Sequence, residues 1–319
     1  MRSDKRIGVS IIVPVFNTDP FFLSNCLSSL SRQRYNNFEV LLIDSSTDKN
    51  TITILDEFRK SDSRFRVISS TKGVSKQRNV GIENAKFPLL AFVDSDDFIS
   101  PNYLADIVEI FERKEVDIVF PQLKRIEYSN HLPTKEDFIE IAPLQEKIDD
   151  SNFFVNTPKN GLVNPVKVYS KEIIGKTRFD EKLSHGEDMM FNYELSKKGF
   201  LAHFCPSALY SFTAVQGNNA ALKRLSRSSI VIIKRVYDLL KIYKNKSSKN
   251  FEGIYYQFSY LFRIYYYTSI KYNQIKWVLW LTKYRFYYLR NNHSPKWVFY
   301  LLFPFLRKAI FKLIKKDDS

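Results

Sequence analysis

The sequence predicts an α/β fold in which a mostly parallel sheet is flanked by helices on both faces. Over about the first 120 residues, short β-rich runs alternate with segments whose apolar residues recur at helical spacing. Alternation of this kind places parallel strands side by side and helices over both faces of the sheet. Polar or acidic residues follow several of the runs. Because ligands bind beyond the carboxyl ends of such strands, we expect the functional site there.

Each predicted element has a local signal. Residues 18–20 (Thr-Asp-Pro) combine a capping residue with an early proline, which favours a helix start. Residues 100–101 (Ser-Pro) start another helix in the same manner, and apolar residues between 54 and 58 mark a helix between these two. The β-rich runs are 10–15, 38–43, 65–68, 89–93 and 116–120. Residues 129–161 are polar and poorly periodic, so no structure is predicted for them.

The positive charge of the chain is concentrated in its last third. Residues 221–319 hold 21 Lys and Arg against 4 Asp and Glu, a net charge of +17, whereas residues 1–220 hold 28 against 30. The same last third contains all three Trp residues and 24 of the 49 aromatic residues. We therefore expect two parts with different tasks, a ligand-binding domain over 1–220 and a helical, basic, aromatic-rich extension over 221–319.

The composition of the extension predicts peripheral attachment to an anionic membrane surface. Tyr and Trp favour the membrane–water interface, and clustered cations attract anionic lipids. Two alternatives stay open, a helical subdomain packed on the core or on a partner subunit and, less favoured, a single-stranded nucleic-acid binder. No run reaches the roughly 18 uncharged apolar residues of a membrane span. The two cysteines, Cys26 and Cys205, lie far apart and predict a reducing compartment.

The strongest chemical signal is the acidic sequence that follows the run 89–93. Asp94, Asp96 and Asp97 crowd the end of a hydrophobic strand. Like charges this close are unfavourable unless a cation compensates them, and carboxylate oxygens suit Mg²⁺ or Mn²⁺. A solvated acidic turn that caps the next helix is the alternative interpretation.

Two weaker signals accompany it. Residues 72–81 contain two glycines together with Lys72, Lys76 and Arg78 at a predicted helix start, a combination that favours a diphosphate. Glu187 and Asp188 precede an apolar helical run, where a carboxylate can accept a proton from an attacking hydroxyl. The alternatives are an ordinary basic helix for the first and carboxylates that complement the helix dipole for the second.

Taken in order, these signals resemble the family 2 glycosyltransferases of the GT-A fold. The resemblance covers roughly residues 7 to 215, and it is carried by the segments 9–17, 29–39, 72–97, 163–169 and 179–191. It implies a GT-A-like, Rossmann-like sheet. It also implies an inverting enzyme that transfers a sugar from a nucleotide-sugar to a hydroxyl group.

The resemblance implies roles for residues on the donor side of the site. Pro14, Phe16 and Asp44 are expected to border the nucleoside, with Asn17 beside them, and Asp44 is expected to face a uracil. Arg78 is expected near the nucleotide. Lys72, from the basic segment 72–81 described above, is a further cation for the diphosphate. Asp94 and Asp96 form the DxD pair, in which Asp94 contacts the ribose or a metal-bound water and Asp96 binds the metal directly.

On the acceptor side, the resemblance makes Asp188 the general base, with Glu187 as its substitute. Lys167 and His185 are expected near the acceptor. The implied donor is a UDP-sugar and the implied acceptor is a saccharide or lipid-linked saccharide in surface-polysaccharide synthesis. No nucleic-acid partner is expected. The implied location is the cytoplasm, peripheral to the inner face of a bacterial cell membrane.

Two departures from the family pattern affect these expectations. Residues 44–48 (Asp-Ser-Ser-Thr-Asp) are one residue shorter than the usual acidic loop, which leaves a GDP- or dTDP-sugar open as donor. Residues 211–218 lack the basic or His residue that many relatives carry after the position of Tyr210. A non-catalytic, membrane-associated scaffold with the same fold is the rival from another functional class.

Overall fold

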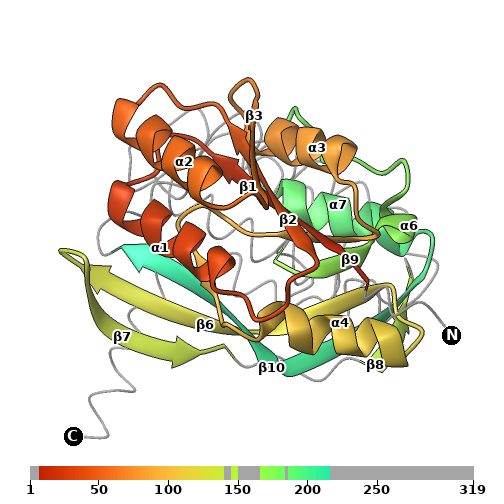
Figure 1. Ribbon diagram of the computed structural model, residues 1–319. Helices are drawn as coiled ribbons and strands as arrows, with labels where there is room; N and C mark the ends of the chain where they lie inside the picture. The colour runs from red at the N-terminus through yellow and green to blue at the C-terminus, as the bar shows by residue number, and fades with distance from the viewer. Residues whose placement is uncertain (1–6, 140–144, 150–165, 184–185, 216–319) are drawn as a thin grey trace, which may run out of the picture. The chain divides into compact units, whose positions relative to one another are not determined.

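The structure, a computed structural model, describes residues 7–139, 145–149, 166–183 and 186–215. They form an α/β unit built on one ten-stranded, mixed sheet (Figure 1). His185 and the predicted extension over 221–319 lie outside the described residues. Among the described residues, no helix has the length and hydropathy needed to cross a membrane.

The first half of the sheet is parallel, as the alternating sequence pattern predicts. Its strands stand in the order β3 (Phe65–Ser69), β2 (Phe38–Asp44), β1 (Val9–Val15) and β4 (Leu89–Phe92). Strands β1 and β4 are buried along their whole length and β2 almost so, which explains their continuous apolar character. The polar residues that follow β1, β2 and β4 therefore meet at one edge of the sheet.

The second half of the sheet is mixed. Strand β9 (Val168–Ser170) lies antiparallel between β4 and the long strand β6 (Ile118–Ser129). Strand β6 runs parallel to β10 (Phe200–Val215), and most of the ladder in the sheet is parallel. Antiparallel strands complete the edges: β5 (Phe98–Ile99) and β8 (Gln145–Ile148) on β10, and β7 (Leu132–Phe138) on β6.

Helices cover both faces of the sheet. Helices α1 (Pro20–Ser31) and α4 (Tyr103–Arg113) share one apolar core with alternate residues of β1, and α2 (Lys49–Ser61) packs on α1. Helices α3 (Val74–Asn84) and α7 (Glu187–Ser196) cover the other face. There, Phe191 of α7 stacks on Phe179 and meets Phe92 of β4 edge-on. The short helix α6 (Lys171–Ile174) follows β9.

The sequence prediction needs correction after residue 116. The predicted strand 116–120 is the start of β6, which continues to Ser129, and residues left without a prediction form β7 and β8. The helix expected from residues 100–101 begins at Tyr103, after a turn through Pro101 and Asn102. The sequence pattern does not predict strand β7, because its side chains are largely exposed and do not alternate between apolar and polar.

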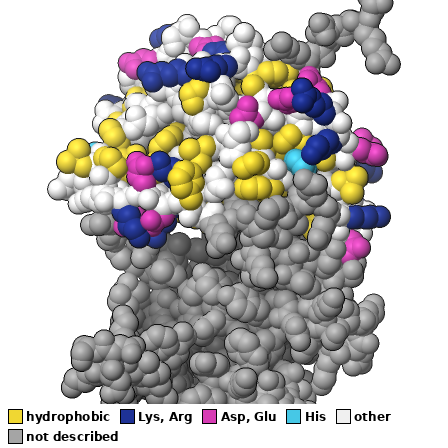
Figure 2. All heavy atoms as spheres, turned by 90° about the horizontal axis from the view of Figure 1, so that it is seen from below, with side chains coloured by type: hydrophobic (Ala, Val, Ile, Leu, Met, Phe, Trp, Pro, Cys, Tyr) yellow, Lys and Arg dark blue, Asp and Glu magenta, His cyan; other side chains and the backbone are white. Residues whose placement is uncertain are grey.

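Charged side chains of both signs are mixed on one face of this unit (Figure 2). The face in Figure 2 shows basic and acidic side chains interspersed with hydrophobic ones. This mixture agrees with the near balance of 28 basic and 30 acidic residues in positions 1–220.

Candidate active site

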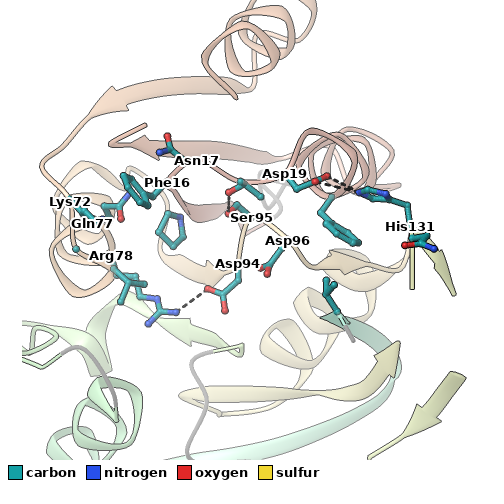
Figure 3. Close-up of a pocket in the computed structure, with 17 residues that line it drawn as sticks. Phe16, Asn17, Asp19, Lys72, Gln77, Arg78, Asp94, Ser95, Asp96 and His131 are labelled. Atoms are coloured by element: carbon teal, nitrogen blue, oxygen red, sulfur yellow. Dashed lines mark hydrogen bonds and ion pairs between the residues drawn. The ribbon is translucent and has the colours of Figure 1, made fainter. Parts of the chain in front are cut away.

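The carboxyl ends of β1 and β4 open onto a cleft of about 760 Å³. Most of the residues that line it come from the loop after β1, from α3, from the turn after β4 and from the β6–β7 turn (Figure 3). Its position beyond the parallel strands is the one that the fold class predicts. The cleft has three parts: a basic and aromatic wall at Phe16 and Lys72, an acidic centre at Asp94 and Asp96, and an opposite wall at Phe22 and His131.

The basic and aromatic wall contains Pro14, Phe16 and Lys72. Pro14 lies within β1 and Phe16 follows that strand with its ring partly exposed. The ammonium nitrogen of Lys72 lies 4.0 Å from the centroid of the Phe16 ring, a cation–π contact that positions both side chains. A flat aromatic ring beside a cation suits a base and an adjoining phosphate group.

Asn17 organises the loop behind this wall. Its backbone is left-handed, with φ of 47°, a conformation that Asn tolerates better than most residues. Its side-chain oxygen accepts hydrogen bonds from the backbone N–H groups of Thr47 (2.8 Å) and Asp48 (3.0 Å). The Asp44 carboxylate accepts a hydrogen bond from the N–H of Ser46 (2.9 Å), and Asp44 is not among the described residues that line the cleft.

The three carboxylates of the acidic turn lie in different surroundings. Asp94 and Asp96 line the cleft, whereas Asp97 is buried. The Asp97 carboxylate accepts hydrogen bonds from the Tyr210 hydroxyl (2.7 Å) and from the Thr213 N–H (2.8 Å), both on β10. The N–H of Asp94 in turn donates to the Tyr210 oxygen (3.1 Å). The far strand of the sheet thereby fixes the acidic turn.

The environment of the turn favours a bound cation. Close packing of protein around Asp96, which keeps an exposed surface in the cleft, raises its pKa to about 6, and the charge of Asp94 adds to the rise. Burial, followed by the charges of Asp96 and Asp94, also raises the pKa of Asp97. Carboxylates whose charge is unfavourable in isolation gain stability from a nearby cation.

Arg78 connects this turn with helix α7. Its guanidinium is buried, and it forms ion pairs with Asp94 (2.9 Å), Glu187 (3.2 Å) and Asp188 (2.6 Å). Burial opposes the charge of Arg78, but the carboxylates of Asp188, Asp94 and Glu187 outweigh this effect and raise its pKa. The structure therefore brings together carboxylates that lie more than 90 positions apart in the sequence, between 94 and 187.

Burial shifts the pKa of Asp188, which pairs with Arg78, and the pKa of Lys167, which lies near Asp188. Burial raises the pKa of Asp188 to about 8, and the charge of Arg78 only partly offsets this effect. The side chain of Asp188 nevertheless keeps 23% of its surface exposed. Lys167 is fully buried, and burial lowers its pKa to about 7 against the opposing charge of Asp188. A carboxylate with a pKa near neutrality is suited to general-base catalysis.

The position of Arg78 depends on how closely α3 packs on the sheet. A Cβ atom at Gly81 would lie 2.3 Å from a methyl carbon of Ile12 on β1, so only glycine permits this approach. One turn earlier, the side-chain amide of Gln77 donates to the carbonyl oxygens of Val15 and Ile43, both at 2.7 Å. The end of α3 that lines the cleft is thus tied to the ends of β1 and β2.

The described residues offer a cation two carboxylates and no closed cage. No group of three or more His, Cys, Asp or Glu side chains in the described ranges is arranged to hold a metal ion. Mg²⁺ is commonly held by one or two carboxylates and completes its shell with substrate phosphates and water. Asp94 and Asp96 fit that kind of site.

Sequence reasoning missed Gln77, Tyr210 and the opposite wall of the cleft. Gln77 lies inside the basic segment 72–81, and an uncharged amide there gives no local signal of its bonds to two strands. Tyr210 and His131 lie far along the chain, and only the tertiary fold brings His131 to the cleft and the buried Tyr210 to the acidic turn. Of the two residues expected on the acceptor side, Lys167 lies buried near Asp188 and does not line the cleft.

Comparisons with known proteins agree with this geometry. Residues 10–175 match the family described as glycosyl transferase family 2. The chain is 38% identical over 112 residues to the uncharacterized glycosyltransferase EpsJ of Bacillus subtilis, over 35% of this chain and 32% of EpsJ. It is 27% identical over 179 residues to glycosyltransferase GlyG of Streptococcus pneumoniae, over 54% of this chain and 59% of GlyG. The matches thus span between a third and three fifths of these relatives.

Solved structures show the same fold. The structure of Staphylococcus aureus TarS 1–349 in complex with UDP-GlcNAc matches with a TM-score of 0.61 and 22% identity, over 79% of this chain and 71% of that one. The structure of GalNAc-T7 with UDP, GalNAc and Mn²⁺ matches with a TM-score of 0.56 and 16% identity, over 72% of this chain and 48% of that one. On the family match over residues 10–175 and this shared architecture, the chain belongs to glycosyl transferase family 2 and has the GT-A fold.

Proposed function

We propose that the protein is an inverting, metal-dependent glycosyltransferase that moves a sugar from a UDP-sugar to a hydroxyl of a saccharide or lipid-linked saccharide. The observation that carries the proposal is the Arg78 network, in which one guanidinium joins Asp94 at the acidic turn to Asp188 on α7. A donor-binding centre and a proton acceptor are then next to each other. The UDP and UDP-GlcNAc complexes of TarS support the choice of donor.

The donor occupies the first two parts of the cleft in this proposal. Phe16 and Pro14 contact the base, and Lys72 contributes a positive charge to the phosphates. Asp94 and Asp96 would hold Mg²⁺ or Mn²⁺, and such an ion would supply positive charge to the departing nucleoside diphosphate. The structure of GalNAc-T7 with Mn²⁺ is a precedent for a metal ion within this fold.

Asp188 acts as the general base. Arg78 holds its Oδ1 atom, and we assign the proton of the acceptor hydroxyl to Oδ2. The acceptor oxygen attacks the anomeric carbon from the face opposite the diphosphate, so that the C–O bond forms as the bond to the diphosphate breaks. A single displacement inverts the configuration. Glu187, which Arg78 also contacts, is the less favoured base because it is more deeply buried.

Hydrolysis of a nucleotide-sugar panel tests the activity. UDP-, GDP- and dTDP-sugars are incubated with the protein and with MgCl₂, MnCl₂ or EDTA, and the released nucleoside diphosphate is measured. We expect release from UDP-sugars that depends on the metal. Release from GDP- or dTDP-sugars alone would contradict the choice of a UDP-sugar and identify the other nucleotide-sugar as the donor. No release and no binding of any nucleotide would contradict the proposed activity and support the rival function, a non-catalytic scaffold.

The basic segment 221–319 supports a location at the membrane. We propose that it attaches the enzyme to the cytoplasmic face of a membrane rich in anionic lipid, where lipid-linked acceptors lie. Its net charge of +17 and 24 aromatic residues support this assignment. In vesicle flotation, the full chain is expected to rise with anionic vesicles and to stay behind with zwitterionic ones. Equal behaviour with both would contradict it.

A further inference from the structure

The third part of the cleft has no role in the donor site described above. Strands β6 and β7 are joined by a two-residue turn, Asn130 and His131, since Ser129 and Leu132 are already paired. Both turn residues line the cleft, together with Phe22 of α1. In Figure 3, His131 lies on the side away from Phe16 and Lys72, with Asp94 and Asp96 between the two walls.

This wall is aromatic. The His131 ring lies 4.9 Å from Phe21 and 5.5 Å from Phe22, measured between ring centroids. Tyr128 meets Phe22 edge-on at 5.3 Å from within β6. The cluster joins the start of α1 to a hairpin more than 100 positions later in the chain. Half of the His131 side-chain surface is nevertheless exposed and available to a ligand.

A carboxylate holds the imidazole in place. The Nε2 atom of His131 lies 3.3 Å from both carboxylate oxygens of Asp19. Asp19 also caps α1 by accepting a hydrogen bond from the Phe21 N–H at 2.9 Å, so its own position is fixed. The ring is therefore oriented by packing on two phenylalanines and by one carboxylate.

The turn that carries His131 has a left-handed backbone at both of its residues. Asn130 and His131 both have positive φ, at 50° and 64°. Two-residue hairpin turns with this geometry favour Asn followed by Gly, because glycine has no Cβ. A histidine in the second place is strained by about 1 kcal/mol or more. Such strain at a residue that lines the cleft supports a functional role for its side chain.

The chemistry of the wall suits a neutral sugar ring. A pyranose has an apolar C–H face that packs on aromatic rings and an edge of hydroxyls that bonds to carboxylate, amide and imidazole groups. The half-exposed His131 ring, packed on the largely buried Phe22, supplies the first, and Asp19 and Asn130 supply the second. The carboxylates of Asp19 and Asp96 disfavour a second phosphate group at this wall.

We propose that Phe22, Asn130 and His131, with Asp19 behind the imidazole, form the subsite that binds the acceptor saccharide. The proposal rests on the proposed function, because that function assigns the donor to the basic and aromatic wall and to the acidic centre. The acceptor sugar packs its apolar face on the aromatic wall and directs a hydroxyl toward the acidic centre. His131 is a binding residue here and takes no part in proton transfer.

The test observes His131 directly. The chain contains four histidines, so protein labelled with ¹³C-histidine gives a simple spectrum of imidazole C–H signals, and a His131→Gln variant identifies the signal of His131. UDP with Mg²⁺ is added first. The methyl glycosides of glucose, galactose and N-acetylglucosamine then follow, each titrated to tens of millimolar. We expect at least one glycoside to shift the His131 signal in a saturable manner.

His131→Gly separates binding from structure. Glycine relieves the positive φ but also removes the contacts of the ring with Phe21, Phe22 and Asp19, so the two effects oppose each other and we expect a thermal midpoint close to that of the wild type. Affinity for the glycoside, followed by its own saturation-transfer signal, is expected to fall at least tenfold. His203→Ala is the matched control, because His203 lies on β10 beside Lys114 and outside this cleft.

The outcomes distinguish this proposal from the proposed function. Glycoside affinity that is unchanged in His131→Gly would overturn the subsite. A His131 signal that UDP with Mg²⁺ shifts fully and that no glycoside moves would also overturn it, since the wall then belongs to the donor. Absence of UDP binding in all variants would instead contradict the donor site. Retained UDP binding with loss of glycoside binding in His131→Gly supports both.

Discussion

Replacement of Arg78 by Met is the perturbation that most directly probes the site. Methionine keeps much of the length of the side chain and its compatibility with α3, but it removes the guanidinium that joins Asp94, Glu187 and Asp188. Glu187 is buried and Asp188 is three-quarters buried, so both lose their cation in a place that water hardly reaches. We therefore expect a large loss of stability.

The expected loss follows from the burial of the network. Removal of one partner of a buried ion pair lowers the free energy of unfolding by about 3–5 kcal/mol. At about 2–4 °C per kcal/mol for a domain of this size, the thermal midpoint should fall by roughly 6–20 °C. Asp94 contributes less because 36% of its side chain is exposed and can be hydrated.

The loss should also depend on pH. Burial already raises the pKa of Asp188 to about 8, above its value of about 4 in an unfolded chain. Without Arg78 the folded-state pKa rises further, so the folded protein binds a proton that the unfolded chain releases. Stability then falls as pH increases across this interval. We expect the deficit of Arg78→Met to be larger at pH 9 than at pH 6.

Calorimetry of both proteins at pH 6 and pH 9 measures these quantities. Arg113→Met is the matched control, because Arg113 pairs with Glu109 on the surface of α4, with 74% of the Arg113 side chain exposed. An exposed helical pair of this kind contributes about 0.5 kcal/mol. If Arg78→Met lowers the midpoint no more than Arg113→Met does, the network does not hold α3 and α7 together.

Four further results are expected. Asp188→Asn should reduce turnover at least about 100-fold in a transfer or hydrolysis assay, with donor affinity within twofold of the wild type, since a general base contributes in this range. The pH profile of kcat/KM should rise up to about pH 8 as Asp188 loses its proton. Asp96→Ala should abolish the Mn²⁺-dependent part of UDP binding in calorimetry. Gly81→Ala should lower the free energy of unfolding by about 1–3 kcal/mol, because its Cβ would collide with Ile12.

Surface positions provide controls for these variants. Asp137 on β7 is 42% exposed and pairs with Lys135, so Asp137→Asn and Asp137→Ala should match the wild type in turnover and UDP binding. Near-normal turnover of Asp188→Asn or a flat profile between pH 6 and 9 would contradict the base assignment. Metal-dependent UDP binding that survives in Asp96→Ala would contradict the metal assignment. Unchanged stability of Gly81→Ala would mean that α3 can move away from β1.

The parallel half of the fold was predictable because burial leaves a clear pattern. Strands β1, β2 and β4 are almost continuously apolar, and the acidic turn follows β4 directly. The apolar cluster of α4 faces the core as its spacing predicts. Local sequence sufficed for these elements because each is defined by residues near to one another in the chain.

The remaining parts depend on contacts between distant residues. The contact of Arg78 with Asp188 follows from the packing of α3 and α7 on the same face of the sheet, and a local pattern does not contain it. His131 reaches the cleft only because β6 is long enough to carry its turn back to α1. A turn of Asn and His also lacks the glycine that usually marks such hairpins.

The end of β10 lies at the cleft and is joined to the basic segment 221–319 by a short stretch of sequence. Val215 is the last residue of that strand and itself lines the cleft. In the sequence, only residues 216–220 separate Val215 from the basic segment 221–319. A membrane that binds the first residues of the segment 221–319 would therefore keep the cleft near its surface. An acceptor tethered in such a surface would need only a short stem to be glycosylated.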